Sequence, residues 1–175
     1  MKQSSKISLC AVCSALATVI MLVSYFPYLT YAVPAVAGLC VMIPLMEISP
    51  LWALYTYLVS AVLSLFFAEP ESKFIYIFLC GFYPILKALI ERIHKMWLEW
   101  IIKLAIFEIS LYSVFKVTVL FTDISYDDIG GFGKYGIIAF IILCNIVFVL
   151  YDIAISRVSM FYIYRIRPKI KKYIK

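Results

Sequence analysis

Six runs of apolar residues, separated by short polar or proline-containing segments, constrain the fold of this chain most strongly. They cover residues 7–26, 31–46, 51–68, 74–90, 97–121 and 135–164. A helix needs about 20 apolar residues to cross the hydrocarbon core of a bilayer. The chain is 65% apolar over 175 residues, more than a soluble domain of this size can bury. We therefore expect an all-α, multi-pass protein of the cell membrane, with one compact six-helix domain (residues 1–175).

The positions of lysine and arginine predict the orientation of this bundle. Cytoplasmic loops carry an excess of basic residues, and an N-terminus inside the cell places most basic residues on that side. The external segments then hold only Lys73 and Lys134. We expect both termini to be cytoplasmic and the basic tail, residues 165–175, to attract anionic lipid. The same pattern explains the net charge of +6 without a nucleic-acid partner.

Prolines predict irregular backbone in two of the runs. The run 31–46 is short and contains Pro34 and Pro44, so we expect a kinked or partly re-entrant helix. Pro84 lies near the centre of the run 74–90. Since proline has no amide hydrogen to donate, it should interrupt that helix and free the carbonyl of Cys80.

The sequence offers little support for catalysis or for a bound metal. The single histidine, His94, lies in a short polar segment away from other candidate ligands. Cys10 and Cys13 form a C-x-x-C pattern inside an apolar run, without a second pair. The glycines of residues 131–136 match G-x-G-x-x-G, but they join two membrane helices instead of a strand and a helix. We expect no enzyme activity, no cofactor and no metal site.

Ionisable residues in the fifth run are candidates for function. Glu108 falls near the middle of this run, and Tyr112 and Lys116 follow at intervals of four residues, so the three share one helix face. A charge at this depth costs roughly 2.5–3.5 kcal/mol, and such residues normally face the protein interior or a hydrated cavity. They form either a structural hydrogen-bond network or a ligand site.

Further polar residues could complete a pocket that opens to the outside. Lys73 and Tyr76 begin the fourth run from its external end, and Asn145 lies near the middle of the last run. An asparagine side chain can both donate and accept hydrogen bonds. By contrast, Lys87 and Glu91 have the i, i+4 spacing of a structural ion pair at a helix end.

Small residues recur along the first run and predict a partner helix. Ala11, Ser14, Ala15 and Thr18 follow one another every three or four residues. In a membrane, small side chains let two helix backbones approach closely enough for dispersion contacts to hold them together. Ala11 and Ala15 form a small-xxx-small pair of this kind.

The six runs, the cytoplasmic termini, the Ala11-x-x-x-Ala15 pair and the polar residues of the outer half resemble the substrate-binding S component of energy-coupling factor transporters. The resemblance covers the whole chain. It implies that Ala11 and Ala15 contact a transmembrane coupling subunit, which two cytoplasmic ATPases drive. It also implies capture of a vitamin-like small molecule from outside, in a pocket formed by the first outer loop and the fourth to sixth helices. The implied substrate-binding residues are Lys73, Tyr76, Glu108, Tyr112, Lys116 and Asn145.

A second hypothesis explains the same features by a membrane protein without a transport role. An assembly, immunity or scaffold factor would also use a helix face of small residues and a basic tail to contact partners and lipid. The two hypotheses differ in one respect, because only a capture subunit needs to bind a small molecule.

Overall fold

The chain is helical over the residues that its computed structural model describes, which are 3–26, 28–93, 95–122 and 134–170. No strand occurs within these ranges, so the prediction of an all-α chain is confirmed there. The main helices are α1 (Gln3–Leu22), α2 (Ala32–Glu47), α3 (Pro50–Phe67), α4 (Pro70–Ile75), α5 (Tyr83–Ile90), α6 (Met96–Thr122), α8 (Lys134–Phe161) and α9 (Arg167–Ile170).

Three sequence predictions concern residues outside the described ranges in whole or in part. His94 is one of them. The others are the glycine-rich segment 131–136, of which 131–133 fall outside, and the end of the basic tail, 171–175.

Four helical stretches of the described chain are long and apolar enough to cross a membrane. They are Gln3–Tyr25, Pro50–Phe67, Pro70–Ile93 and Ile138–Ile166. Helix α2 is apolar but shorter, with 16 residues, and spans about 24 Å at 1.5 Å per residue, against about 30 Å for a hydrocarbon core. These helices are consistent with a membrane protein, whereas a six-span topology and its orientation stay predictions.

The chain forms two compact units. The first comprises Met1–Phe115 and the second Lys116–Lys175. Helix α6 contributes to both, because the division falls between Phe115 and Lys116. In the second unit, α8 is followed by a π-helical segment, Tyr162–Ile166, and then by α9.

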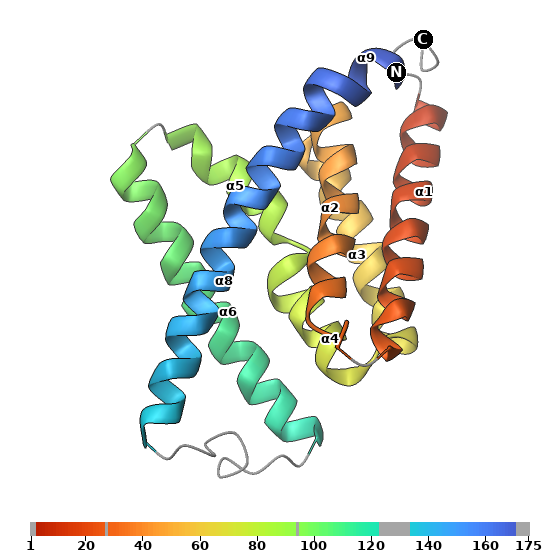
Figure 1. Cartoon of the computed structure of the whole chain (residues 1–175). Coiled ribbons are helices and arrows are strands. Elements are labelled where there is room, and N and C mark those ends of the chain that lie inside the picture. Colours follow the sequence, from red (N-terminus) through yellow and green to blue (C-terminus); the bar gives the residue numbers. More distant parts are fainter. Residues whose placement is uncertain (1–2, 27, 94, 123–133, 171–175) are drawn as a thin grey trace. The chain divides into compact units, whose positions relative to one another are not determined.

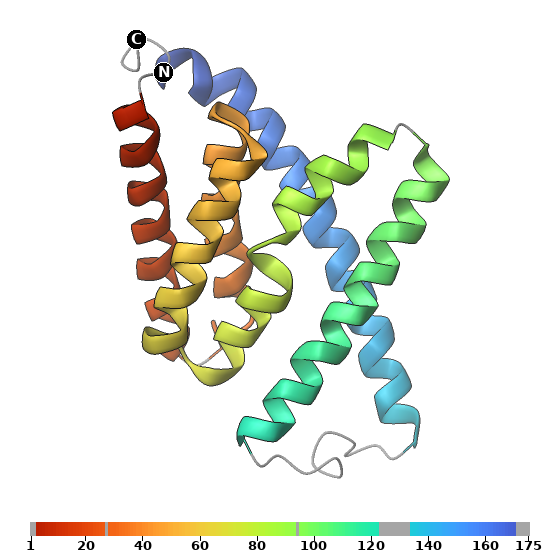
Figure 2. The ribbon, with the colours of Figure 1, turned by 180° about the vertical axis from the view of Figure 1, so that it is seen from behind.

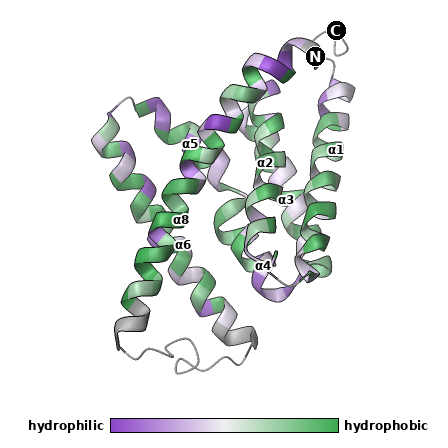
Figure 3. Cartoon of the chain, in the orientation of Figure 1, coloured by the Kyte–Doolittle hydropathy of each residue, from purple (hydrophilic) through white to green (hydrophobic). Residues whose placement is uncertain are grey.

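Small side chains form the centre of the first unit. Helix α1 packs against α2 and α3, which also contact each other, and the three run side by side in both views (Figures 1 and 2). Ala17, Ala37 and Ala53, one from each helix, are completely buried. Apolar residues cover most of α1 (Figure 3), and many of the large ones are exposed. This arrangement, with small residues between helices and large apolar residues outside, is typical of helix packing in membranes.

Helix α2 is one continuous α-helix, and a kink in it stays a prediction. Pro44 lies within the last turn, and the Pro44 carbonyl accepts a hydrogen bond of 3.0 Å from the amide of Ile48. A proline so near the end removes little of the helix, because few residues follow it.

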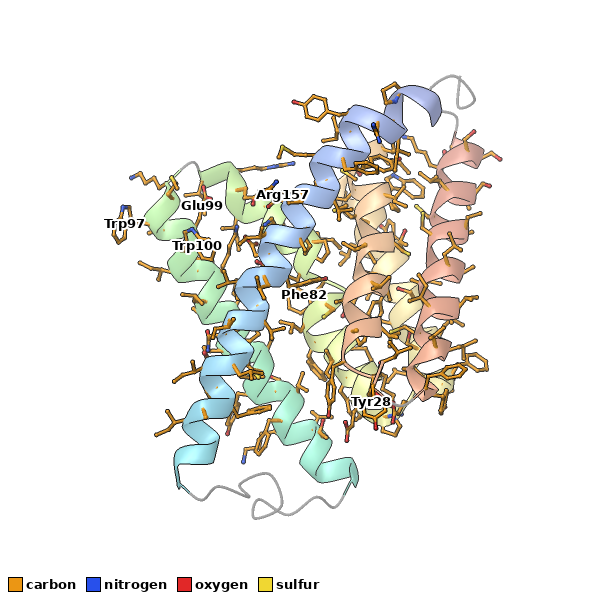
Figure 4. All side chains as sticks on the ribbon, viewed as in Figure 1. Tyr28, Phe82, Trp97, Glu99, Trp100 and Arg157 are labelled. Carbon is orange, nitrogen blue, oxygen red and sulfur yellow. The ribbon has the colours of Figure 1, made fainter. Side chains whose placement is uncertain are left out.

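The predicted interruption of the fourth run is confirmed. Helix α4 continues into a π-helical segment, Tyr76–Cys80, and the chain then turns at Gly81 and Phe82 before α5 begins at Tyr83. Figure 4 shows Phe82 at this break. Irregular backbone at membrane depth is tolerated where protein covers it, and Cys80, Gly81 and Tyr83 are all buried.

The first turns of α6 expose large aromatic side chains. Trp97 is 88% exposed and projects away from the helix (Figure 4), with Trp100 one turn later. Tryptophan is enriched where a membrane meets water. Among residues 96–118 of α6, the buried positions follow at helical spacing and are Lys103, Phe107 and Ser110.

Candidate functional site

Five buried hydroxyl groups gather at one end of the first unit, where the α3–α4 turn meets the end of α1. We call them the hydroxyl cluster, and each residue is at most 1% exposed. Its members are Ser24, Ser60, Ser64, Ser72 and Tyr76. Buried polar groups normally form hydrogen bonds, and an unmet one costs roughly 1–3 kcal/mol. The partners of these hydroxyls therefore decide whether the cluster is structural or functional.

The hydroxyl groups of Tyr76 and Ser60 form a hydrogen bond with each other. Their hydroxyl oxygens lie 2.6 Å apart, and either can donate the proton. The Ser60 hydroxyl also lies 3.0 Å from the carbonyl of Tyr57. Tyr76 is completely buried, so this predicted site residue lies inside the first unit and contacts helix α3.

The contact between Ser60 and Tyr76 fixes the register of the two helices. Helices α3 and α4 are joined by a short turn and contact each other, so they are antiparallel. Ser64 lies one turn after Ser60, and Ser72 lies one turn before Tyr76. Both steps lead toward the α3–α4 turn, and residues four apart share one helix face. Ser64 therefore lies on the side of α3 that faces α4, and Ser72 lies on the side of α4 that faces α3. Both are one turn beyond the Ser60–Tyr76 bond.

The hydroxyl oxygens of Ser64 and Ser72 are buried and have no hydrogen-bond partner in the part of the chain that the structure describes. Serine in a helix usually donates to the carbonyl one turn earlier, as Ser113 does to Ile109 over 2.8 Å. Two unpartnered hydroxyls on facing helices are rare in an apolar bundle. Each can donate a hydrogen bond to a polar group that comes within reach.

The loop after α1 closes the same end of the unit. The Ser24 hydroxyl accepts a hydrogen bond of 3.3 Å from the backbone amide of Glu69, and the Ser24 carbonyl accepts one of 3.4 Å from the Thr30 hydroxyl. The Glu69 side chain is half-buried. Its Oε2 atom is fully buried, without a hydrogen-bond partner among the described residues. Glu69 thus adds a carboxylate oxygen to the two open hydroxyls.

Two charged side chains lie near Glu69 on α4. The Glu71 carboxylate accepts a hydrogen bond of 2.9 Å from the exposed Tyr31 hydroxyl. Partial burial, followed by this bond to Glu71, raises the pKa of Tyr31 above its ordinary value. The ammonium group of Lys73, another predicted site residue, lies 5.5 Å from the centre of the Phe74 ring. Glu71 and Lys73 therefore each have a contact within the chain.

A tyrosine stabilises the irregular backbone beside the hydroxyl cluster. In the π-helical segment the amide of Gly81 bonds to the carbonyl of Tyr76 over 2.7 Å, instead of to Ile77 as in an α-helix. The Tyr57 hydroxyl donates to the Ile77 carbonyl over 2.7 Å. The Tyr57 ring lies so close to Gly81 that an added Cβ would be 2.7 Å from its Cε2 atom. Gly81 and Tyr57 thus form one interlocked element.

The remaining predicted site residues lie elsewhere. Glu108 and Tyr112 are exposed on α6 within the first unit. Lys116 is exposed at the start of the second unit, and Asn145 lies in that unit on α8. The Asn145 amide donates to the carbonyl of Ile141 over 3.0 Å. Within the first unit the structure thus brings Tyr76 to the hydroxyl cluster and places Lys73 on α4, which continues into the segment that begins at Tyr76. A ligand contact for any of the six stays a prediction.

The sequence contains a signal for two members of the hydroxyl cluster, Ser60 and Ser64. Thr56, Ser60 and Ser64 are spaced four residues apart within an apolar run, and all three are buried. Such a polar stripe on one face of an apolar helix predicts contact with another polar surface. Ser24 and Glu69 carry no comparable pattern, because they join the cluster through loop and turn geometry.

Two buried lysines share one carboxylate near the other end of α5. The Glu91 Oε1 atom lies 3.4 Å from the Lys87 ammonium group and 3.2 Å from that of Lys103. Both lysines are 4% exposed, whereas the Glu91 side chain is 45% exposed. The predicted ion pair of Lys87 and Glu91 is confirmed, and Lys103 of α6 joins it.

We expect Glu91→Gln to lower the free energy of unfolding by about 1 kcal/mol. The loss of a shared charge leaves two buried ammonium groups with a weaker partner, and the partial exposure of Glu91 limits the effect. Thermal unfolding in detergent measures the change. Glu99→Gln is the control, because Glu99 lies on α6 one turn before Lys103. Equal effects of the two substitutions would contradict the structural role of Glu91.

Comparisons with known proteins add no identification. No protein-family model matches the chain, and neither a curated protein nor a solved structure matches it. Among the described residues, no group of three or more histidine, cysteine, aspartate or glutamate side chains could hold a metal ion.

Proposed function

We propose that this protein is the membrane-embedded substrate-capture subunit of an importer of the energy-coupling factor type. It binds a vitamin-like small molecule from outside the cell. A transmembrane coupling subunit, driven by two separate ATPase subunits, then completes delivery. The chain spans the cell membrane several times in this proposal and performs no catalysis itself.

The hydroxyl cluster is the observation that carries the proposal. Ser64 and Ser72 bury hydroxyl groups without a hydrogen-bond partner among the described residues, although each such group destabilises a folded protein. A membrane protein that binds no ligand at this site would be more stable with alanine at both positions. A protein that binds a polar molecule needs hydroxyls available at its site, and ligand pockets are mostly apolar with few polar groups.

The position of the cluster agrees with capture from outside. The bonds from Glu69 to Ser24 and from Tyr31 to Glu71 bring the α1–α2 loop and the α3–α4 turn to one end of the first unit. With the N-terminus inside, as the lysine and arginine distribution predicts, this end faces outward. The shared lysine network of Glu91 then lies toward the cytoplasm.

The proposal is tested by extracting small molecules from the protein after purification in mild detergent. We expect mass spectrometry of the extract to detect one compound in about equimolar amount with the chain. The Ser64→Ala/Ser72→Ala variant should retain at least tenfold less of it, because the open hydroxyls are lost. An extract without any such compound would favour the scaffold or assembly role instead.

The exposed small residues of α1 support the coupling part of the proposal. Ala11 and Ala15 are exposed, whereas Ser14 and Ala17 face the core of the first unit. The Thr18 hydroxyl donates to the Ser14 carbonyl over 2.9 Å. The pair at positions 11 and 15 therefore lies on the exposed side of α1 and is suited to close approach by another helix.

We expect Ala11→Leu/Ala15→Leu to abolish co-purification with the coupling subunit while small-molecule retention is unchanged. The added side chains would hold the partner backbone away, but they point out of the first unit and should not affect its packing. Affinity purification of the tagged chain from native membranes measures the partner, and Val12→Leu, also exposed, is the matched control. Unchanged recovery of the partner in the double variant would contradict this assignment.

A further inference from the structure

We infer that the hydroxyl cluster binds a small molecule carrying a protonated amine, whose ammonium group contacts Glu69 and whose polar groups contact Ser64 and Ser72. This inference rests on the proposed capture function and specifies its substrate class. It depends on three polar atoms that are buried at one end of the first unit and have no hydrogen-bond partner among the described residues.

Glu69 is the charged member of this site. Its Oε2 atom is buried and without a partner in the described chain, while its backbone amide is bonded to Ser24. A buried carboxylate oxygen is stabilised by a cation or by a hydrogen-bond donor. The Glu69 Oε2 atom therefore lacks a donor, and a primary ammonium group supplies three donors together with the positive charge that complements a carboxylate.

The other charges at this end do not meet that need. Glu71 is also negative and accepts the Tyr31 hydroxyl, and the ammonium group of Lys73 lies at the Phe74 ring. The α1–α2 loop, residues 23–31, contains no charged side chain. Two carboxylates and one ammonium give a local net charge of −1, which favours a cation over an anion.

The two open hydroxyls determine what else the molecule must carry. Ser64 and Ser72 can each donate one hydrogen bond and accept others, so they suit hydroxyl, carbonyl or ring-nitrogen groups equally well. Glu69 begins the turn that leads to Ser72, three residues later, and Ser64 faces Ser72 across the helix pair. The ammonium and a neutral polar group should therefore occur in one compact molecule.

Three small probes of similar size and different charge test this inference. Ethanolamine is a cation, ethylene glycol is neutral and glycolate is an anion, and each carries a hydroxyl. We expect millimolar ethanolamine to raise the thermal unfolding midpoint of the purified wild-type chain by at least 2 °C, as selective binding to the folded state requires. The other two probes should shift it by less than 0.5 °C.

Matched variants separate this inference from the capture function. Glu69→Gln should remove the ethanolamine shift, whereas Glu71→Gln should keep it, because the Glu71 carboxylate is already bonded to Tyr31. Equal shifts from all three probes, the largest shift from glycolate, or an unchanged shift in Glu69→Gln would overturn the inference. If a co-purified compound lacks an amine but is lost in Ser64→Ala/Ser72→Ala, capture stands and the amine assignment fails. If no compound and no shift are found, both fail.

Discussion

Replacing Ser64 and Ser72 by alanine should stabilise the empty protein while it abolishes binding. The two hydroxyl oxygens are buried without a partner among the described residues, and an unmet buried polar group costs roughly 1–3 kcal/mol. We expect Ser64→Ala/Ser72→Ala to raise the free energy of unfolding of ligand-free protein by about 2 kcal/mol. Chemical denaturation in detergent, after removal of bound small molecules, measures this change.

Serines that are satisfied within the chain provide the controls for this prediction. The hydroxyl of buried Ser14 lies 3.0 Å from the carbonyl of Ala11, and that of Ser60 contacts Tyr76. Ser14→Ala should be near neutral, and Ser60→Ala should destabilise by about 1 kcal/mol because it leaves the buried Tyr76 hydroxyl without this partner. Destabilisation by Ser64→Ala/Ser72→Ala would show that the two hydroxyls are structural.

The second large effect is expected at Gly81. A Cβ atom there would lie 2.7 Å and 2.8 Å from two carbons of the Tyr57 ring and 2.9 Å from the backbone oxygen of Tyr76. The ring is held in place by the bond from its hydroxyl to Ile77, so it cannot move without losing that bond. We expect Gly81→Ala to lower the free energy of unfolding by about 3 kcal/mol, measured by denaturation in detergent.

A double-mutant cycle shows whether this loss arises from the Tyr57 ring. In a Tyr57→Ala background, Gly81→Ala should cost at least 1 kcal/mol less than in the wild-type background, because the ring carbons are gone. The cost of Gly81→Ala should not fall to zero in this background, since the Tyr76 carbonyl stays close to the added Cβ. An identical cost in both backgrounds would contradict the interlocked arrangement of Gly81 and Tyr57.

Hydrophobic run length predicted the helices of the described chain closely. The run 51–68 corresponds to α3 (Pro50–Phe67), and the run 97–121 corresponds to α6 (Met96–Thr122). The constraint is strong because an unpaired backbone group in hydrocarbon is costly, so each apolar run of this length must be helical. Pro84 likewise predicted a break, since its missing amide hydrogen acts locally.

The π-helical segment could not be predicted in the same way. One carbonyl of the segment, that of Ile77, accepts its hydrogen bond from Tyr57, which lies 20 residues away in the sequence. Only the packing of α3 against the fourth run brings this hydroxyl to the carbonyl that the wider turn leaves free. Local sequence contains the proline that breaks the helix, but not the distant side chain that stabilises the break.

The predicted depth of ionisable residues in the membrane did not identify the hydroxyl cluster. It selected Glu108 because charge in hydrocarbon is costly, yet the buried polar positions among residues 96–118 of α6 are Lys103 and Ser110. Serine carries no charge and can bond to its own helix, so its position in the sequence does not show whether its hydroxyl is satisfied. For Ser64 and Ser72 this depends on the register of α3 and α4, which the Ser60–Tyr76 contact reveals.

Native mass spectrometry of the wild-type chain, released from detergent under mild conditions, tests the capture function most directly. We predict a main species heavier than the bare chain by the mass of one small molecule. The same preparation of Ser64→Ala/Ser72→Ala should give the bare chain alone. A wild-type spectrum that contains only the bare chain, or an equal added mass in the double variant, would contradict a capture site at the hydroxyl cluster.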